Sequence, residues 1–397
     1  MNSFTNPIVE ATPPAGAADP SVAYRDGYYY YCKSLDDGAI GVAKAERLQD
    51  IGKVPMRRVW TAPGGTAYSK QVWAPELQYV QGRWFIYFAA SDGDNATHRM
   101  YVLESQSQDP QGDYTFRGKL ADSTDQWAID GTTFEHGGQL YFLWSGWRDA
   151  SAGFPQVSYV ARMRNPWTLD GQRHEISAPD RAWEQHGAAL QEGHAVLKRH
   201  GRLFIVYSAS GSWTDDYQLG LLSFIGGNIL DAAAWRKHDT PVFTKSPGGG
   251  TFGPGHNVFT TSPDGAEHWI VYHAIDTARG GWKQRSVRAQ AFGWNVDGTP
   301  DFGRPVAVGK AVAAPSGTGT ADVAARRAAD RQRVDALALR RQRVAGMPIS
   351  AAERRDALNG NHRHLHEAHG LDPLTAGALT HARTTRPAIA RTEAASG

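Results

Sequence analysis

The sequence holds one cysteine, Cys32, and this excludes an internal disulfide as a source of stability. It has no apolar run long enough to cross a bilayer, so we expect no membrane-spanning segment. No aromatic residue follows Phe302, although the chain holds 14 Phe, 15 Tyr and 13 Trp. Because aromatic side chains supply much of a core, this absence separates the end of the chain from the rest.

We therefore expect a main domain over residues 1–314 and an Arg- and Ala-rich tail over residues 315–397, partly helical or disordered. The tail holds 13 Arg and no Lys against 8 acidic residues, whereas the main domain holds 29 basic and 32 acidic side chains. A slightly acidic main domain gives no reason to expect nucleic acid or a membrane as a partner. No signal peptide is recognisable, which leaves both a cytoplasmic and a mature secreted protein open.

One pattern recurs five times along the main domain: a strand-like run, a turn containing glycine, and a returning strand rich in aromatic and branched residues. The turn glycines are Gly27, Gly82, Gly138, Gly201 and Gly265, separated by 55, 56, 63 and 64 residues. Asp-Gly, Gln-Gly and Gly-Gly between strands are typical of β-hairpins. A repeat of this size with several strands per unit predicts an all-β, five-bladed β-propeller with a central active-site cavity.

Charged residues stand at corresponding places in these hairpins. Asp19 and Asp130 lie eight residues before their turn glycines, and Glu192 and His256 lie nine before theirs. Equivalent positions in propeller blades point the same way, so we expect these four side chains to converge on the central axis at one end. Two Asp, one Glu and one His would then share a single cavity.

Other residues near these positions are candidates for substrate binding. Trp73 would sit at the cavity rim as a platform for a sugar ring, although core packing explains it equally well. Glu76 either faces the cavity or pairs with a neighbouring blade. Arg285 and Arg288 share a later strand, and an arginine beside the acids would hold one of them ionised.

Three carboxyl groups without a nucleophilic Ser or Cys motif favour acid/base chemistry on a neutral polar substrate. Glycoside hydrolysis needs one protonated and one ionised carboxyl group flanking the scissile bond. A third carboxylate near the acid raises the acid's pKa by like-charge repulsion. A non-catalytic sugar-binding propeller is an alternative from another class, and the three acids argue against it.

The chain resembles glycoside hydrolase family 43 across roughly residues 6–310. The motifs that carry the resemblance are Ala18-Asp19-Pro20-Ser21, Val72-Trp73-Ala74-Pro75-Glu76, Ile129-Asp130-Gly131, Glu192-Gly193-His194 and Gly255-His256-Asn257. Each motif alone is weak, but five in order at blade spacing are specific. The resemblance implies a five-bladed propeller that inverts the anomeric centre.

The same resemblance implies roles for individual residues. Asp19 would be the general base, Asp130 would tune and orient the acid, and Glu192 would be the general acid. His256 would lie at the axis and hold a cation, often calcium, through water molecules; no organic cofactor is expected. Arg288 would contact Asp130 or the sugar.

His194 follows Glu-Gly at a place where many relatives carry Pro, and this resembles the exo-acting α-1,5-L-arabinofuranosidases. We therefore count His194 among the substrate-binding residues. The first hypothesis is a monomeric enzyme that releases terminal L-arabinofuranose from arabinan or arabino-oligosaccharides. The alternative enzyme is a β-xylosidase or a bifunctional arabinosidase/xylosidase, since only the sugar pocket would differ.

Overall fold

The computed structural model describes residues 3–11, 16–35, 38–150 and 153–317. The chain divides into the units Met1–Thr318 and Gly319–Gly397, and the predicted helical or disordered tail lies almost wholly outside the described residues. Within the described ranges, no helix combines the length and the apolar character that crossing a membrane requires.

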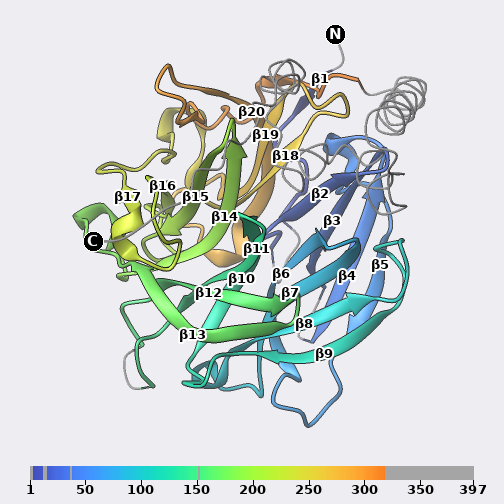
Figure 1. The fold of residues 1–397 in the computed structure, drawn as a ribbon. Helices are drawn as coiled ribbons and strands as arrows, with labels where there is room; N and C mark the ends of the chain where they lie inside the picture. Colours follow the sequence, from blue (N-terminus) through green and yellow to red (C-terminus); the bar gives the residue numbers. More distant parts are fainter. Residues whose placement is uncertain (1–2, 12–15, 36–37, 151–152, 318–397) are drawn as a thin grey trace, which may run out of the picture. The chain divides into compact units, whose positions relative to one another are not determined.

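Five four-stranded antiparallel sheets follow one another along the chain and around the molecule, so the predicted five-bladed propeller is confirmed (Figure 1). Each blade is built from consecutive strands, so that the first strand of each is innermost and the fourth is outermost. The colours of Figure 1 run from the blue first blade to the orange fifth blade, which lies beside the first.

The strands of each blade have the following bounds. Blade 1 contains β2 (Ser21–Arg25), β3 (Tyr28–Ser34), β4 (Ala39–Ala45) and β5 (Met56–Thr61). Blade 2 contains β6 (Lys70–Val80), β7 (Arg83–Ser91), β8 (Arg99–Ser105) and β9 (Tyr114–Leu120). Blade 3 contains β10 (Ala128–His136), β11 (Gln139–Gly146), β12 (Val157–Asn165) and β13 (Thr168–Ser177). Blade 4 contains β14 (Gln191–Arg199), β15 (Arg202–Ala209), β16 (Gln218–Phe224) and β17 (Trp235–Lys237). Blade 5 contains β18 (Phe252–Thr261), β19 (His268–Ile275), β20 (Arg285–Trp294) and β21 (Pro300–Asp301).

The remaining elements are short. A separate pair of strands is formed by β1 (Ser3–Thr5) and β22 (Ala311–Ala313). The described helices are single 3-10 turns: η1 (Leu48–Asp50), η2 (Asn95–Thr97), η3 (Ala182–Glu184), η4 (Ala232–Ala234), η5 (Pro247–Gly249) and η6 (Trp282–Gln284).

The five predicted turn glycines all lie between the first and second strands of a blade. In blades 1 to 4 the turn has two residues, both with positive φ, as in Asp26 (φ 53) and Gly27 (φ 86). Two such residues match the twist of a hairpin and favour glycine. In blade 5 the connection is longer, because β18 ends at Thr261 and β19 begins at His268.

The core is divided into five apolar clusters, one at each interface between neighbouring blades. Between blades 2 and 3, for example, Tyr87 packs with Phe142 at a ring separation of 5.7 Å. The alternation of strand residues explains this arrangement, because successive side chains enter the interfaces on the two faces of a blade. The innermost strand ends are thereby left free to carry polar groups.

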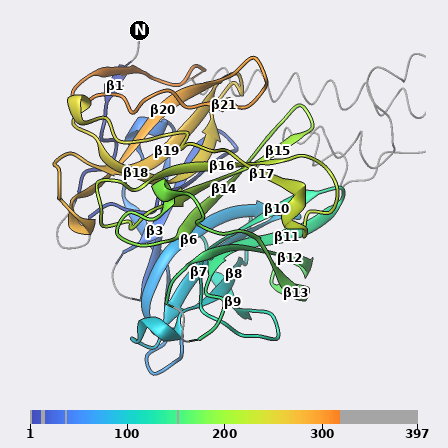
Figure 2. The ribbon, with the colours of Figure 1, turned by 90° about the vertical axis from the view of Figure 1, so that its left-hand side faces the viewer.

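The N-terminal segment closes the ring between blades 5 and 1. The Asn6 side chain donates to the Ala289 carbonyl and accepts from the Ala289 N–H, each at 2.9 Å. The backbone of Ile8 and Val9 bonds to Val287 of β20, and Ala17 bonds to Arg285. Both ribbon views place β1 beside the orange strands of blade 5 (Figures 1 and 2). The N-terminal segment is therefore hydrogen-bonded to blade 5 before the chain enters blade 1.

Candidate active site

Near the start of each innermost strand, one residue lies in the left-handed region of backbone conformation. These residues are Asp19 (φ 47), Ala74 (φ 42), Asp130 (φ 55), Gly193 (φ 55) and His256 (φ 46). In blades 2 to 5 the pairing register with the second strand shifts at this point, which marks a β-bulge. Such bulges redirect side chains near active sites, and Asp, His and Gly tolerate positive φ better than branched residues do.

This shared conformation corrects the register used in the sequence analysis. His256 occupies the same place in its blade as Asp19 and Asp130 do in theirs. It lies nine rather than eight residues before the turn glycine because the hairpin connection of blade 5 is longer. In blade 4 the corresponding residue is Gly193, so Glu192 stands one position earlier. A Cβ at Gly193 would lie 3.1 Å from the His256 ring, so only glycine lets blades 4 and 5 approach this closely.

Asp19 lies among three basic groups from blade 5. Its Oδ1 is 3.3 Å from each of His256 Nδ1, His273 Nδ1 and Arg285 Nη1. Its backbone N–H donates to His273 Nδ1 at 3.2 Å. Burial alone would raise the pKa of Asp19, but the positive charges of His256 and Arg285 outweigh it and hold that pKa well below its usual range. Asp19 is thus an ionised carboxylate at neutral pH.

Asp130 connects the base side of the site to the acid side. It is 5% exposed, its Oδ2 accepts from the Gly193 N–H at 2.9 Å, and the same atom is 3.7 Å from His256 Nδ1. Burial raises the pKa of Asp130, His256 opposes this, and the negative charge of Asp19 adds to it. Asp130 therefore fixes the backbone that carries Glu192.

Glu192 has the opposite character to Asp19. It is 7% exposed, and its Oε1 accepts a hydrogen bond from the Tyr217 hydroxyl at 3.0 Å. Burial, reinforced by the charge of Asp130, raises the pKa of Glu192 to about 8. One buried site therefore holds an ionised Asp19 and a protonated Glu192 at neutral pH, which is the division of labour that acid/base catalysis needs.

His256 is the basic side chain at the centre of this group of acids. Burial would lower its pKa, but Asp19 and Asp130 outweigh that effect and raise it. Its Nδ1 faces these two carboxylates, and it is 4% exposed. Among the described residues, no group of three or more His, Cys, Asp or Glu side chains has the arrangement of a metal site.

Glu76 is a fourth carboxyl group in the same environment, and the sequence left its place open between the cavity and a neighbouring blade. It is 8% exposed, and Ser21 of blade 1 hydrogen-bonds to it. Burial raises the pKa of Glu76 to about 7, against the opposing effect of His256. Glu76 therefore contacts the neighbouring blade 1 through Ser21, and it also interacts electrostatically with His256, Asp130 and Asp19 in the cavity.

The structure separates the two arginines that share β20. Arg288 is fully buried, donates to Thr251 Oγ1 at 2.6 Å and forms an ion pair with Asp276. Within the described part of the chain, these partners take the place of the expected contact with Asp130, and a contact of Arg288 with the sugar stays a prediction. Arg285 takes that place beside the acids, because two residues three apart on a strand project to opposite faces.

His194 and Trp73 have contrasting surroundings. His194 is 3% exposed, its Nε2 lies 2.7 Å from Ser158 Oγ, and burial lowers its pKa to about 3. It is therefore a neutral imidazole. Trp73 is 37% exposed and stacks on His98 at a ring separation of 3.9 Å. One face of an exposed, held indole suits a sugar ring.

A pair of exposed tryptophans adjoins the site from two other loops. Trp213 and Trp282 are 39% and 51% exposed, with ring centroids 5.6 Å apart. The Trp282 carbonyl accepts from Arg285 Nε at 3.2 Å, and Arg285 also contacts Asp19. Sequence reasoning missed this pair because its members lie 69 positions apart on loops of different blades.

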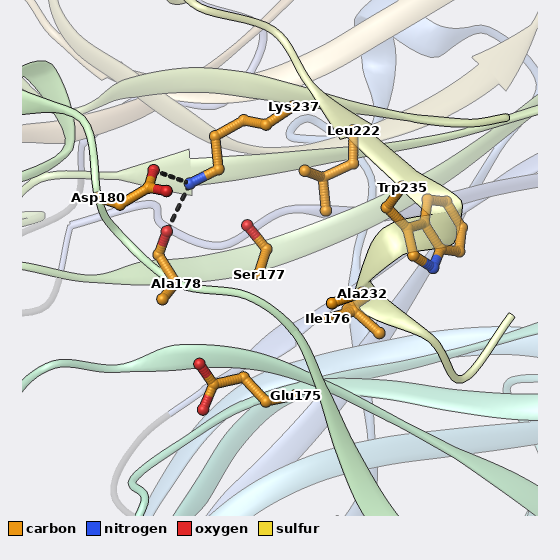
Figure 3. A pocket seen from close by; sticks show the side chains of 9 residues that line it. All are labelled: Glu175, Ile176, Ser177, Ala178, Asp180, Leu222, Ala232, Trp235 and Lys237. Carbon is orange, nitrogen blue, oxygen red and sulfur yellow. Dashed lines mark hydrogen bonds and ion pairs between the residues drawn. The ribbon is translucent and has the colours of Figure 1, made fainter.

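A pocket of about 270 Å³ lies elsewhere, between the outer strands of blades 3 and 4 (Figure 3). The residues that line it are Glu175, Ile176, Ser177, Ala178, Asp180, Leu222, Ala232, Trp235 and Lys237. The Lys237 amine is bonded to Asp180 and to the Ala178 carbonyl, as Figure 3 shows. Glu175 pairs with Arg148. The charges of this pocket therefore serve to hold structure.

Comparison with known proteins agrees with this geometry. An extracellular exo-α-(1→5)-L-arabinofuranosidase of Streptomyces avermitilis is 38% identical over 77% of this chain and 64% of its own length. An α-L-arabinofuranosidase 43 of Humicola insolens is 35% identical over 73% of this chain and 62% of its own. The chain thus spans less than two thirds of the length of these two relatives.

A solved structure of an α-L-arabinofuranosidase from Lactobacillus brevis superposes with a TM-score of 0.71 at 36% identity, covering 77% of this chain and 98% of that one. The model of glycosyl hydrolases family 43 matches residues 4–300. The resemblance inferred from the motifs is confirmed, and the chain belongs to glycosyl hydrolase family 43.

Proposed function

We propose that this protein is an inverting exo-α-L-arabinofuranosidase that releases terminal L-arabinofuranose from α-1,5-linked arabinan or arabino-oligosaccharides. The observation that carries the proposal is one buried site in which Asp19 lies beside His256 and Arg285 while Glu192 is buried against Tyr217 and lies close to Asp130 through Gly193. These surroundings lower the pKa of Asp19 and raise that of Glu192. Inverting glycosidases use such a pair, in which an ionised carboxylate activates water and a carboxylic acid protonates the leaving oxygen.

The hydrolysis follows from these two protonation states. Asp19 accepts a proton from a water molecule as the water oxygen bonds to the anomeric carbon. The bond from that carbon to the leaving oxygen breaks on the opposite face, and Glu192 gives its proton to that oxygen. The nearby Asp130 carboxylate favours the protonated form of Glu192. Arg285 and His256 keep Asp19 ionised.

Two things support the exo action and the choice of arabinose as the sugar: the names of the relatives and the residues assigned to sugar binding. Four relatives with 33–38% identity are named arabinofuranosidases. Two of them are named exo-acting on α-(1→5) linkages, and the other two names give no mode of action. A relative named as a probable endo-arabinosidase is 24% identical. We assign Trp73, His194 and Arg288 to sugar binding, as the motifs of the family imply. A monomer remains our expectation for the assembly.

A calcium ion near His256 also belongs to the proposal. The side-chain amide of Asn257, the next residue, is buried and has no protein partner for either polar atom. Buried polar atoms of this kind are commonly satisfied by water, and water can in turn hold a cation. His256 and Asn257 would hold the ion through such water molecules. Its chemistry would be to add positive charge near the acids.

Product analysis on linear α-1,5-arabino-oligosaccharides tests the proposal. We expect arabinose alone, with substrates shortened one unit at a time. Early products of intermediate length would indicate an endo enzyme. Xylose release from xylo-oligosaccharides, with no action on the arabinose series, would instead support a β-xylosidase.

Substitution of the two acids tests their roles. Asp19→Ala and Glu192→Ala should each lower the rate by roughly 10²-fold to 10⁴-fold, the usual contribution of a general acid or base. Circular dichroism should show an unchanged fold. Near-normal turnover by either variant would contradict the assignment.

A further inference from the structure

We propose that Tyr217 is a positioning residue that determines which oxygen of the Glu192 carboxyl group carries the catalytic proton. This inference rests on the proposed function, in which Glu192 is the general acid. Tyr217 lies directly before β16, is fully buried, and its hydroxyl lies 3.0 Å from Glu192 Oε1. No sequence motif singled it out.

The direction of this hydrogen bond agrees with a chain of donors that begins at a backbone amide. The His256 N–H donates to Ser208 Oγ at 2.7 Å, so this oxygen is an acceptor at that bond. The Ser208 hydroxyl hydrogen is then free to donate to the Tyr217 oxygen, with which it is hydrogen-bonded. The Tyr217 hydrogen consequently points at Glu192 Oε1. With its oxygen accepting from Ser208, the Tyr217 hydroxyl is the donor to Glu192.

This direction places the proton of Glu192. Oε1 receives the Tyr217 hydrogen, and a second hydrogen on Oε1 would face it at close range. The acidic proton therefore resides on Oε2. Without this partner the proton can move to Oε1, and the carboxyl group loses the contact that holds it in its orientation, so the acid is misplaced. Tyr217 removes that uncertainty before substrate arrives, which is preorganisation of the acid.

Packing holds the Tyr217 ring in the required place. The ring is parallel to His273 within 9°, at a centroid separation of 5.5 Å. A Cβ at Gly255 would lie 2.2 Å from Tyr217 Cε1, so a glycine is needed there. His273 also accepts from the backbone N–H of Asp19. The base and the acid are thus positioned against the same stacked pair of rings.

The test is Tyr217→Phe, which keeps the ring and removes the hydroxyl. With an arabino-disaccharide, whose leaving group needs a proton, we expect kcat to fall roughly 30-fold to 100-fold, the cost of a misplaced catalytic group. With 4-nitrophenyl α-L-arabinofuranoside, whose leaving group departs without a proton, we expect a loss of less than about threefold. KM should change little for either substrate.

Tyr87→Phe is the matched control. Tyr87 of blade 2 is also fully buried, and its hydroxyl donates at 2.8 Å to the carbonyl of Pro166, which lies between β12 and β13 of blade 3, outside the site. It should show normal rates with both substrates. Gly255→Ala is a second variant, which displaces the Tyr217 ring without removing its hydroxyl, and it should reproduce the dependence on the leaving group.

An equal loss with both substrates, or no loss with either, would overturn the inference. If the wild-type protein cleaves xylosides instead, the proposed sugar is wrong, and the same comparison with a xylo-disaccharide and its 4-nitrophenyl glycoside decides the role of Tyr217. A wild-type protein that cleaves neither series would overturn both proposals.

Discussion

Glu192→Gln should make the protein more stable at neutral pH, and the gain should depend on pH. The Glu192 carboxyl group is buried, and its pKa is about 8 in the folded protein against 4.5 for an ordinary glutamate. Folding therefore keeps a proton on this group over the range in which the unfolded chain releases it. A group of this kind contributes its full stability below pH 4.5 and loses it as the pH rises through about 8.

The size of the effect follows from the shift. Each pH unit within this window costs about 1.4 kcal/mol, so the wild-type protein loses about 3 kcal/mol between pH 4.5 and pH 7. Glutamine does not titrate, and its amide oxygen still accepts the hydrogen of Tyr217. Relative to the wild type, the free energy of unfolding of the variant should therefore be unchanged at pH 4.5 and higher by about 3 kcal/mol at pH 7. The difference should rise further toward pH 8.

Urea unfolding of the wild type and Glu192→Gln at pH 5, 6, 7 and 8 measures this difference directly. In a separate thermal unfolding experiment, the melting temperatures of the two proteins should differ by roughly 5 °C at pH 7. Glu46→Gln, at an exposed position, is the control for the loss of one acidic residue from the chain. A stability difference that stays constant from pH 5 to pH 8 would refute the inference that Glu192 is held protonated.

Three further predictions concern the rest of the site and the ring. Asp130→Asn removes a negative charge that raises the pKa of Glu192, so the basic limb of the pH–rate profile should move to lower pH; an unmoved limb would contradict the coupling. Asn6→Ala should lower the free energy of unfolding by about 3 kcal/mol, because two buried backbone groups of Ala289 lose their partners, and an unchanged urea midpoint would count against this. Dialysis against EDTA should lower activity and calcium should restore it, if a cation lies near His256; full activity after chelation would exclude that role.

The sequence predicted the features that depend on neighbouring residues. Turn pairs such as Asp26-Gly27 adopt positive φ through their own chemistry, so the five hairpins and the propeller follow from local signals. Asp19 and Asp130 could be found because the repeat gives blades 1 to 4 a residue with positive φ at the same distance from the turn glycine. The outer strands carry weaker patterns, and they were not assigned individually.

The groups that tune the acids could not be predicted, because contacts between blades create them. His273 reaches Asp19 from a strand 254 residues away, and Tyr217 reaches Glu192 from a loop. The choice between Arg285 and Arg288 depends on which face of β20 turns toward the axis, and the spacing of two arginines does not reveal that. A signal existed for Tyr217 only in its place within a polar, aromatic loop of residues 208–217.

The N-terminal residues close the ring of five blades, and this gives them an influence on activity. The segment that bonds to β20 through Ile8 and Val9 leads directly to Asp19, while Arg285, at the start of that same β20, supplies part of the charge that keeps Asp19 ionised. Loss of this segment by proteolysis would remove the bonds of Asn6, Ile8 and Val9 to β20. We therefore expect trimming at this end to lower activity through the position of β20, although none of these three described residues touches the acids.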